Sequence, residues 1–170
     1  MRNSKMKGFT LIELIVVIAI IGVLAAILVP SMIGYVGDSK LSTANSNAKL
    51  AYTNSATYAT KCEVAGFPMD AADKITSQSL KRSASDPTTV TAPTAAPSDA
   101  DHLAALKALM GSESDSAGVV TVIVSAAGTP DKTAWGKTST DSYIGGYPTE
   151  AIAKTSETGG IVLNTAAVQT

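Results

Sequence analysis

A continuous apolar segment from Phe9 to Val29 constrains this chain more than any other feature. Its only charged residue is Glu13, close to its start. At about 1.5 Å per residue, roughly 21 residues form a helix of about 31 Å, which matches the ~30 Å hydrocarbon core of a bilayer. The segment therefore predicts one membrane-spanning helix.

Three basic residues, Arg2, Lys5 and Lys7, precede this segment. Positive charge there holds an N-terminus in the cytoplasm, so we expect a single-pass precursor in the inner or cytoplasmic membrane with its N-terminus inside. A secretory signal would end at a small-residue cleavage site, but here the apolar residues continue past Ala25 and Ala26. Hydropathy alone thus indicates a signal anchor.

The residues around Gly8 indicate the kind of protein more specifically than the hydropathy does. Lys7-Gly8-Phe9-Thr10-Leu11-Ile12-Glu13 resembles the processing motif of the type IV pilin and type II secretion pseudopilin family, whose prepilins carry a class III signal peptide. In that family a membrane peptidase cuts after the glycine and the new N-terminal residue is methylated. The resemblance implies a leader over residues 1–8, cleavage between Gly8 and Phe9, and N-methylation of Phe9. It is strong over residues 7–30 and fades beyond them.

Glu13 has two interpretations. A charge at mid-membrane depth costs about 2.5–3.5 kcal/mol on insertion scales, but Glu13 lies near the cytoplasmic boundary and its side chain can reach the interface. It is then a tolerated boundary residue, as is Thr10. The resemblance implies instead that Glu13 acts in assembly, by pairing with the amine of Phe9 from a neighbouring chain. Breaking such a buried pair is costly, so the pair would set the register between chains.

Gly22 and Pro30 match the positions of helix-weakening residues in the family. The resemblance implies that the helix between them unwinds in an assembled filament. Pro30 removes a backbone hydrogen bond and Gly22 lowers helix propensity by about 1 kcal/mol relative to Ala. A simple kink with close helix packing explains the same two residues in an isolated chain.

Helical periodicity continues beyond Pro30, so we divide the expected helix into a transmembrane or filament-core part, 9–30, and an amphipathic part, 31–61. The apolar stripe of the second part contains Ile33, Val36, Leu41, Ala44, Ala48, Ala51, Ser55 and Tyr58. Such a helix would be roughly 80 Å long, more than a domain of this size can bury.

Residues 62–170 are expected to form an α+β head. The patterns predict helices over 70–81 and from Ser98 or Asp99 to Gly111, a Pro/Thr-rich surface loop over 86–97, and strands at 118–128, 133–137, 142–146 and 160–164. The fold class is thus a long N-terminal helix packed by a small antiparallel sheet, which is the fold that the resemblance implies.

The head offers few candidates for chemistry, and we expect no enzyme activity, no cofactor and no metal. His102 beside Asp99 and Asp101 is better explained by the acidic first turn of a helix than by a metal site, and Cys62 by packing. Glu113 and Asp115 indicate a solvated loop, while Asp131 and Asp141 resemble the calcium loop of major pseudopilins only weakly. The formal charge of −1 would become about −4 without the leader, which disfavours nucleic acid as a partner.

The resemblance implies a structural subunit of a type IV pilus-like filament, with other copies of itself, a prepilin peptidase and methylase, an assembly platform and an ATPase as partners. It would move from the membrane to a cell-surface pilus. Two alternatives remain open: a pseudopilin of a type II secretion or competence system, and a membrane-anchored extracellular binding domain that keeps its leader.

Overall fold

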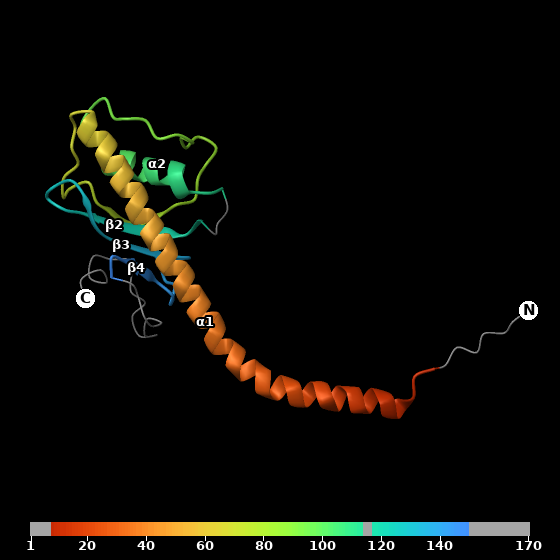
Figure 1. Ribbon diagram of the computed structural model, residues 1–170. Coiled ribbons are helices and arrows are strands. Elements are labelled where there is room, and N and C mark those ends of the chain that lie inside the picture. The colour runs from red at the N-terminus through yellow and green to blue at the C-terminus, as the bar shows by residue number, and fades with distance from the viewer. Residues whose placement is uncertain (1–7, 114–116, 150–170) are drawn as a thin grey trace, which may run out of the picture. The chain divides into compact units, whose positions relative to one another are not determined.

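The computed structural model describes residues 8–113 and 117–149. Their elements follow the order α1, β1, α2, β2, β3, β4 (Figure 1). Their bounds are Leu11–Val64 for α1, Ile75–Ser79 for β1, Asp99–Met110 for α2, Val119–Val124 for β2, Pro130–Gly136 for β3 and Gly145–Tyr147 for β4. The chain divides after Asp38 into two compact units, and α1 contributes to both.

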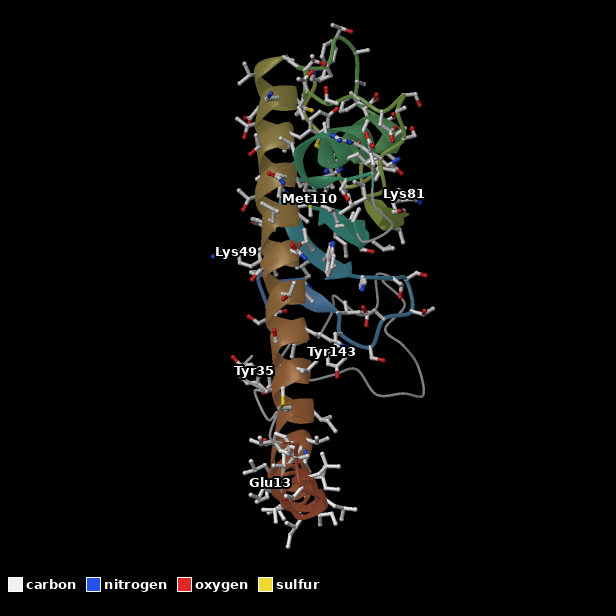
Figure 2. The ribbon with its side chains drawn as sticks, turned by 90° about the vertical axis from the view of Figure 1, so that its right-hand side faces the viewer. Glu13, Tyr35, Lys49, Lys81, Met110 and Tyr143 are labelled. Carbon is white, nitrogen blue, oxygen red and sulfur yellow. The ribbon has the colours of Figure 1, made fainter. Side chains whose placement is uncertain are left out.

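The first unit has no interior of its own. Every described residue from Gly8 to Val36 is exposed, and the large apolar side chains among them are 46% to 83% exposed. Figure 2 shows side chains projecting outward from the helix around the labelled Glu13. Among the described helices, α1 alone is long and apolar enough to cross a membrane.

In the second unit, one face of α1 is buried. The buried positions recur at three- and four-residue steps, which keeps them on one side of the helix. They are Leu41, Ala44, Ala48, Ala51, Ser55, Tyr58, Ala59 and Cys62. The predicted stripe is therefore confirmed from Leu41 onward, whereas Ile33 and Val36 belong to the exposed first unit.

The sheet is an antiparallel meander in the order β1-β2-β3-β4. One of its two inner strands, β2, is rich in valine, and Val120 and Val122 are fully buried in one cluster with the small residues of α1. Thr133 on β3 donates its hydroxyl to the Ala48 carbonyl at 2.7 Å, which ties the sheet to the helix. The α+β class expected from the sequence is confirmed.

Helix α2 begins where its capping residues predict. The Ser98 hydroxyl accepts the Asp101 N–H, and the Asp101 carboxylate accepts the Ser98 N–H at 2.9 Å, so the two form a reciprocal capping box. The buried face of α2 contains His102, Ala105 and Leu106, whereas Leu109 is 41% exposed.

The predicted helix over 70–81 is wrong. Asp70 and Asp73 close a turn instead, in which the Asp73 carboxylate accepts the Asp70 N–H at 2.8 Å. Ile75 then begins β1 and pairs with Val122 on β2. Pairing with a strand more than forty residues later overrides the local helical pattern.

The other strand predictions are right in kind and inexact in their bounds. Residues 118–128 shorten to β2 because Gly128, at φ 75°, turns the chain into β3. The predicted strands over 133–137 and 142–146 appear as β3 and β4, displaced by a few residues. The predicted strand over 160–164 lies outside the described residues.

Candidate processing and assembly site

Gly8 and Phe9 lie in irregular chain just before α1. Helix begins at Leu11, so the Gly8–Phe9 bond is outside the helical hydrogen-bond ladder. Phe9 is 83% exposed, and a β-carbon at Gly8 would meet no atom within 4 Å. The bond predicted to be cut thus lies in an exposed segment outside the helix.

Thr10 and Glu13 form a second capping box. The Glu13 Oε2 atom accepts the Thr10 N–H and the Thr10 hydroxyl, each at 2.8 Å, and the Thr10 Oγ1 atom accepts the Glu13 N–H at 3.3 Å. This arrangement satisfies two backbone donors at the start of the helix, and a carboxylate there is also favoured by the helix dipole. Among the described residues, no ion pair involves Glu13.

The sequence carried the signal for this cap, because Thr-x-x-Glu before an apolar run is a capping-box pattern. Our sequence interpretation assigned Thr10 only a tolerated position. The structure instead gives both residues a local role at the start of the helix. The capping bonds use Oε2, so the same carboxylate still has a second oxygen with which to accept a donor from another chain.

Gly22 and Pro30 both lie within α1, which continues through them. Gly22 has open space where a side chain would stand. Pro30 has no N–H to donate, so one bond of the helical ladder is missing there. In the single chain these residues leave the helix in place, and unwinding in a filament stays a prediction.

His102 does not face an acidic metal cluster. Its Nε2 atom lies 2.7 Å from the Ser55 hydroxyl and its Nδ1 atom 2.8 Å from the Asp73 carbonyl, while its ring stacks on Tyr58 at 5.7 Å. The carbonyl can only accept, so Nδ1 carries the proton and Nε2 accepts from Ser55. The neutral imidazole is therefore fully partnered as a core residue.

Three further candidate residues that the structure describes are Asp141, Asp131 and Cys62. Asp141 accepts the N–H groups of Lys137 and Tyr143 at 3.2 and 3.0 Å, so its carboxylate closes a loop, while Asp131 is exposed on β3. Cys62 is fully buried, and burial raises the pKa of its thiol. Asp115 lies outside the described residues. Across residues 8–113 and 117–149, no three His, Cys, Asp or Glu side chains come together to hold a metal.

Comparison with known proteins supports the resemblance that the sequence analysis describes for the N-terminal residues. Residues 3–29 match the family model described as the prokaryotic N-terminal methylation motif. The chain is 53% identical over 51 residues to the type IV major pilin protein PilA of Myxococcus xanthus, covering 30% of this chain and 23% of that protein. It is 48% identical over 56 residues to the type IV wide pilus major component PilA4 of Thermus thermophilus, covering 33% of this chain and 37% of that protein.

A third relative, the type IV major fimbrial protein FimA of Dichelobacter nodosus, is 55% identical over 40 residues, or 24% of this chain and 26% of FimA. The matched part thus spans about a quarter to a third of these relatives. No solved structure matches the chain significantly. The N-terminal region is thus similar to that of type IV pilins, and these matches cover a minority of the chain.

Proposed function

We propose that this chain, whose N-terminal region carries the type IV prepilin signature, is the structural subunit of a type IV pilus-like filament. The leader, residues 1–8, is removed, Phe9 becomes the methylated N-terminus, and copies of the chain polymerise through the first half of α1. The observation that carries the proposal is the complete exposure of the apolar residues from Phe9 to Val36.

These exposed residues need an apolar surrounding. Burial of one Val, Leu or Ile side chain is worth about 1.5–3 kcal/mol relative to water, and residues 14–29 hold no polar side chain. A membrane provides such a surrounding for the precursor. A bundle of identical helices provides an apolar surrounding again after the subunit leaves the lipid. A homopolymer therefore needs no other apolar partner.

Glu13 has a specific task in this bundle. Cleavage after Gly8 creates a positive amine on Phe9 at the edge of the apolar segment. Its charge requires a counter-charge once water is excluded, and Glu13 is the only acidic residue in the segment. We assign the Glu13 carboxylate of one subunit to the Phe9 amine of an adjacent subunit, where loss of either partner costs about 3–5 kcal/mol.

The remaining partners follow from the same pathway. A prepilin peptidase and methylase acts on Gly8 and Phe9, and an assembly platform with its ATPase transfers subunits from membrane to filament. Arg2, Lys5 and Lys7 hold the precursor's N-terminus in the cytoplasm, so the head lies outside. In the filament, Gly22 and Pro30 mark the part of α1 that unwinds.

The experiment is intact-mass analysis of the protein sheared from its own cells. We expect a chain that starts at methylated Phe9 and sediments as filaments. In the Gly8→Val variant the leader should remain and filaments should be lost, because a branched side chain replaces none at the cleavage site. Gly22→Ala is the matched control: it also adds a side chain at an exposed glycine with open space around it, and it should be cleaved normally.

Other results distinguish the alternatives. A native chain that starts at Met1 and stays monomeric in the membrane supports an anchored binding domain and overturns the filament. A processed chain that forms no surface filament, but is required for protein secretion or DNA uptake, supports a pseudopilin.

A further inference from the structure

The segment 86–97 passes beside α2 without forming helix or strand (Figure 1, the yellow-green trace). Between this segment and the rest of the head is a hollow of about 360 Å³. Tyr58 of α1 and the α2 residues Asp101, Ala104 and Ala105 line it opposite the segment. Small-molecule sites in proteins have volumes of about 300–1,000 Å³, so this hollow is large enough for a compact ligand.

Three contacts hold the segment in place over the hollow. At its start, the Asp86 carboxylate pairs with Lys107 Nζ at 3.4 Å. In its middle, Val90 packs against the core and its carbonyl accepts a hydrogen bond from Lys61 Nζ at 2.8 Å. At its end, the chain enters α2 at the Ser98 cap, and prolines at positions 87, 93 and 97 restrict the backbone between these contacts. The hollow is therefore preformed, and a ligand would not have to order the segment on binding.

The lining of the hollow is mostly hydrocarbon with one charge. Tyr58, Val90, Ala104 and Ala105 contribute apolar surface, together with proline, alanine and threonine residues of the segment. Asp101 is the only charged side chain among the described residues of the lining. A mainly apolar wall with a single polar group that fixes orientation is typical of small-molecule sites.

The Asp101 carboxylate has one oxygen to spare for a ligand. Its Oδ2 atom accepts the Ser98 N–H at 2.9 Å and the Ser98 hydroxyl at 2.6 Å. These bonds from the Ser98 side chain and backbone lower the pKa of Asp101, so the carboxylate is ionised at neutral pH. Among the described residues, Asp101 forms no ion pair and its Oδ1 atom accepts no hydrogen bond. The cap thus holds a negative charge at the edge of the hollow.

We propose that this hollow binds a small organic cation, an ammonium group attached to a compact apolar or aromatic body. The ammonium group donates to Asp101 Oδ1, and the body packs against Ala104, Ala105 and Val90. A metal ion fits poorly, because Ca²⁺ takes six to eight oxygen ligands and the described residues offer no cluster of three candidate ligands. An anion would be repelled by Asp101. The site belongs to the head and does not depend on polymerisation.

His102 provides a local signal with which to test the site. It is the chain's only histidine, and its ring stacks on that of Tyr58 with 5.7 Å between the centroids. We would follow the His102 ring protons by NMR in the mature protein in nonionic detergent, at constant pH 7. The probes are benzylamine, benzyl alcohol and benzoate, which are similar in size and are positive, neutral and negative at this pH.

We expect benzylamine to shift the His102 signals in a saturable way. Benzyl alcohol should bind about three- to fivefold more weakly, the range for losing a partly exposed ion pair, and benzoate should cause no shift. Benzyl alcohol or benzoate binding as tightly as benzylamine, or no saturable shift with any probe, would overturn the proposal.

Two charge variants assign the effect to Asp101. Asp101→Asn removes the charge and keeps an oxygen that accepts the Ser98 N–H, so α2 stays capped and the melting temperature without ligand checks this. Its affinity for benzylamine should fall to the affinity of wild type for benzyl alcohol. Asp99→Asn is the matched control, because it removes the same charge from the same turn of α2 and does not line the hollow. Equal weakening by both variants would show general charge attraction and contradict a specific site.

A second pair of variants tests the hollow without altering its charge. Ala104→Leu fills the space and should abolish the shifts caused by benzylamine. Ala108→Leu adds the same side chain one turn further along α2, outside the lining, and should leave binding unchanged. Benzylamine binding that persists in a folded Ala104→Leu protein would place the ligand elsewhere and overturn the proposal.

Discussion

The side chain of Glu13 has one role within its own chain and a second, proposed role between chains. Within its own chain it caps α1 through Thr10, and in the proposed filament it neutralises the amine of a neighbour. The two roles use different properties of the side chain, because a cap needs an acceptor oxygen and a pair needs a negative charge. Substitutions that keep one property and remove the other therefore separate them.

We predict that Glu13→Gln preserves the cap and prevents assembly. A glutamine at this position still accepts the Thr10 N–H, but it leaves the amine of Phe9 unpaired in an apolar bundle. Cleavage after Gly8 and the amount of protein in the membrane should be normal, while sheared surface filaments, counted by electron microscopy, should be few or absent.

Thr10→Ala is the complementary control. It removes the cap at a cost of about 0.5–2 kcal/mol and keeps the charge of Glu13, so filaments should still form. Filaments at wild-type number in Glu13→Gln would show that the charge is dispensable and would reduce Glu13 to a capping and boundary residue.

His102 is the chain's only histidine, so its titration can be measured alone. Burial among α1, α2 and the turn before β1 lowers its pKa, because the charged form loses water there. The Asp73 carbonyl and the charges of Asp73 and Asp99 offset only part of this effect. The folded pKa thus lies below the unfolded value near 6.5.

The sign of the pH dependence follows. Above pH of about 6.5 both states hold neutral histidine, and below it the unfolded chain binds a proton that the folded head resists. The free energy of unfolding should therefore fall as pH decreases from 7 toward 5, by at most about 1.4 kcal/mol per pH unit for one proton.

Chemical denaturation of the mature protein in detergent measures this slope. His102→Gln should be less stable at every pH and should lose the slope between pH 7 and 5. The carboxylates of Asp86 and Asp101 also have lowered pKa values, but they contribute only at lower pH. An NMR titration that placed the His102 pKa above 6.5 would contradict this prediction.

At the scale of elements, small residues set how closely the sheet approaches α1. Gly145, at the start of β4, rests directly on the backbone of Ala44 and Asn45, and a β-carbon there would overlap those backbone atoms. Gly146 donates its N–H to the Asn45 side chain at 3.1 Å, which fixes the same contact. The strand can pair with β3 only where its backbone meets the helix without a side chain between them.

Gly145→Ala should destabilise the head by about 1–3 kcal/mol, the usual cost of overpacking. Because the overlap is with backbone atoms, removing the neighbouring side chain should give no relief, and Gly145→Ala with Ala44→Gly should be no more stable than Gly145→Ala alone. Thermal or chemical denaturation decides this. Rescue by the second substitution would place the clash at the Ala44 side chain instead.

At the scale of the whole molecule, the division after Asp38 separates a unit without a core from one with a core. We predict that a fragment from Gly37 to Thr170 is a folded, soluble monomer, because the buried stripe of α1 begins at Leu41. Circular dichroism and sedimentation measure this. A disordered or aggregated fragment would show that the head depends on the apolar half of the helix.

Local signals in the sequence were enough for several features. The apolar run predicted the helix over its first half, the spacing of Leu41 to Tyr58 predicted its buried face, and Ser98 predicted the start of α2. Each of these depends on neighbours within a few residues. The Thr10–Glu13 cap is equally local, because both of its residues lie within one turn of the helix start.

Features that depend on distant partners were decided only by the tertiary structure. Ile75 begins a strand because Val122 lies beside it, and His102 is a core residue because Ser55 and the Asp73 carbonyl accommodate both ring nitrogens. The sequence by itself determined where the chain is apolar and how its helices begin, since these are short-range properties. Only folding brought together residues far apart in the chain, and their contacts set the strand pairing and the burial of residues such as His102.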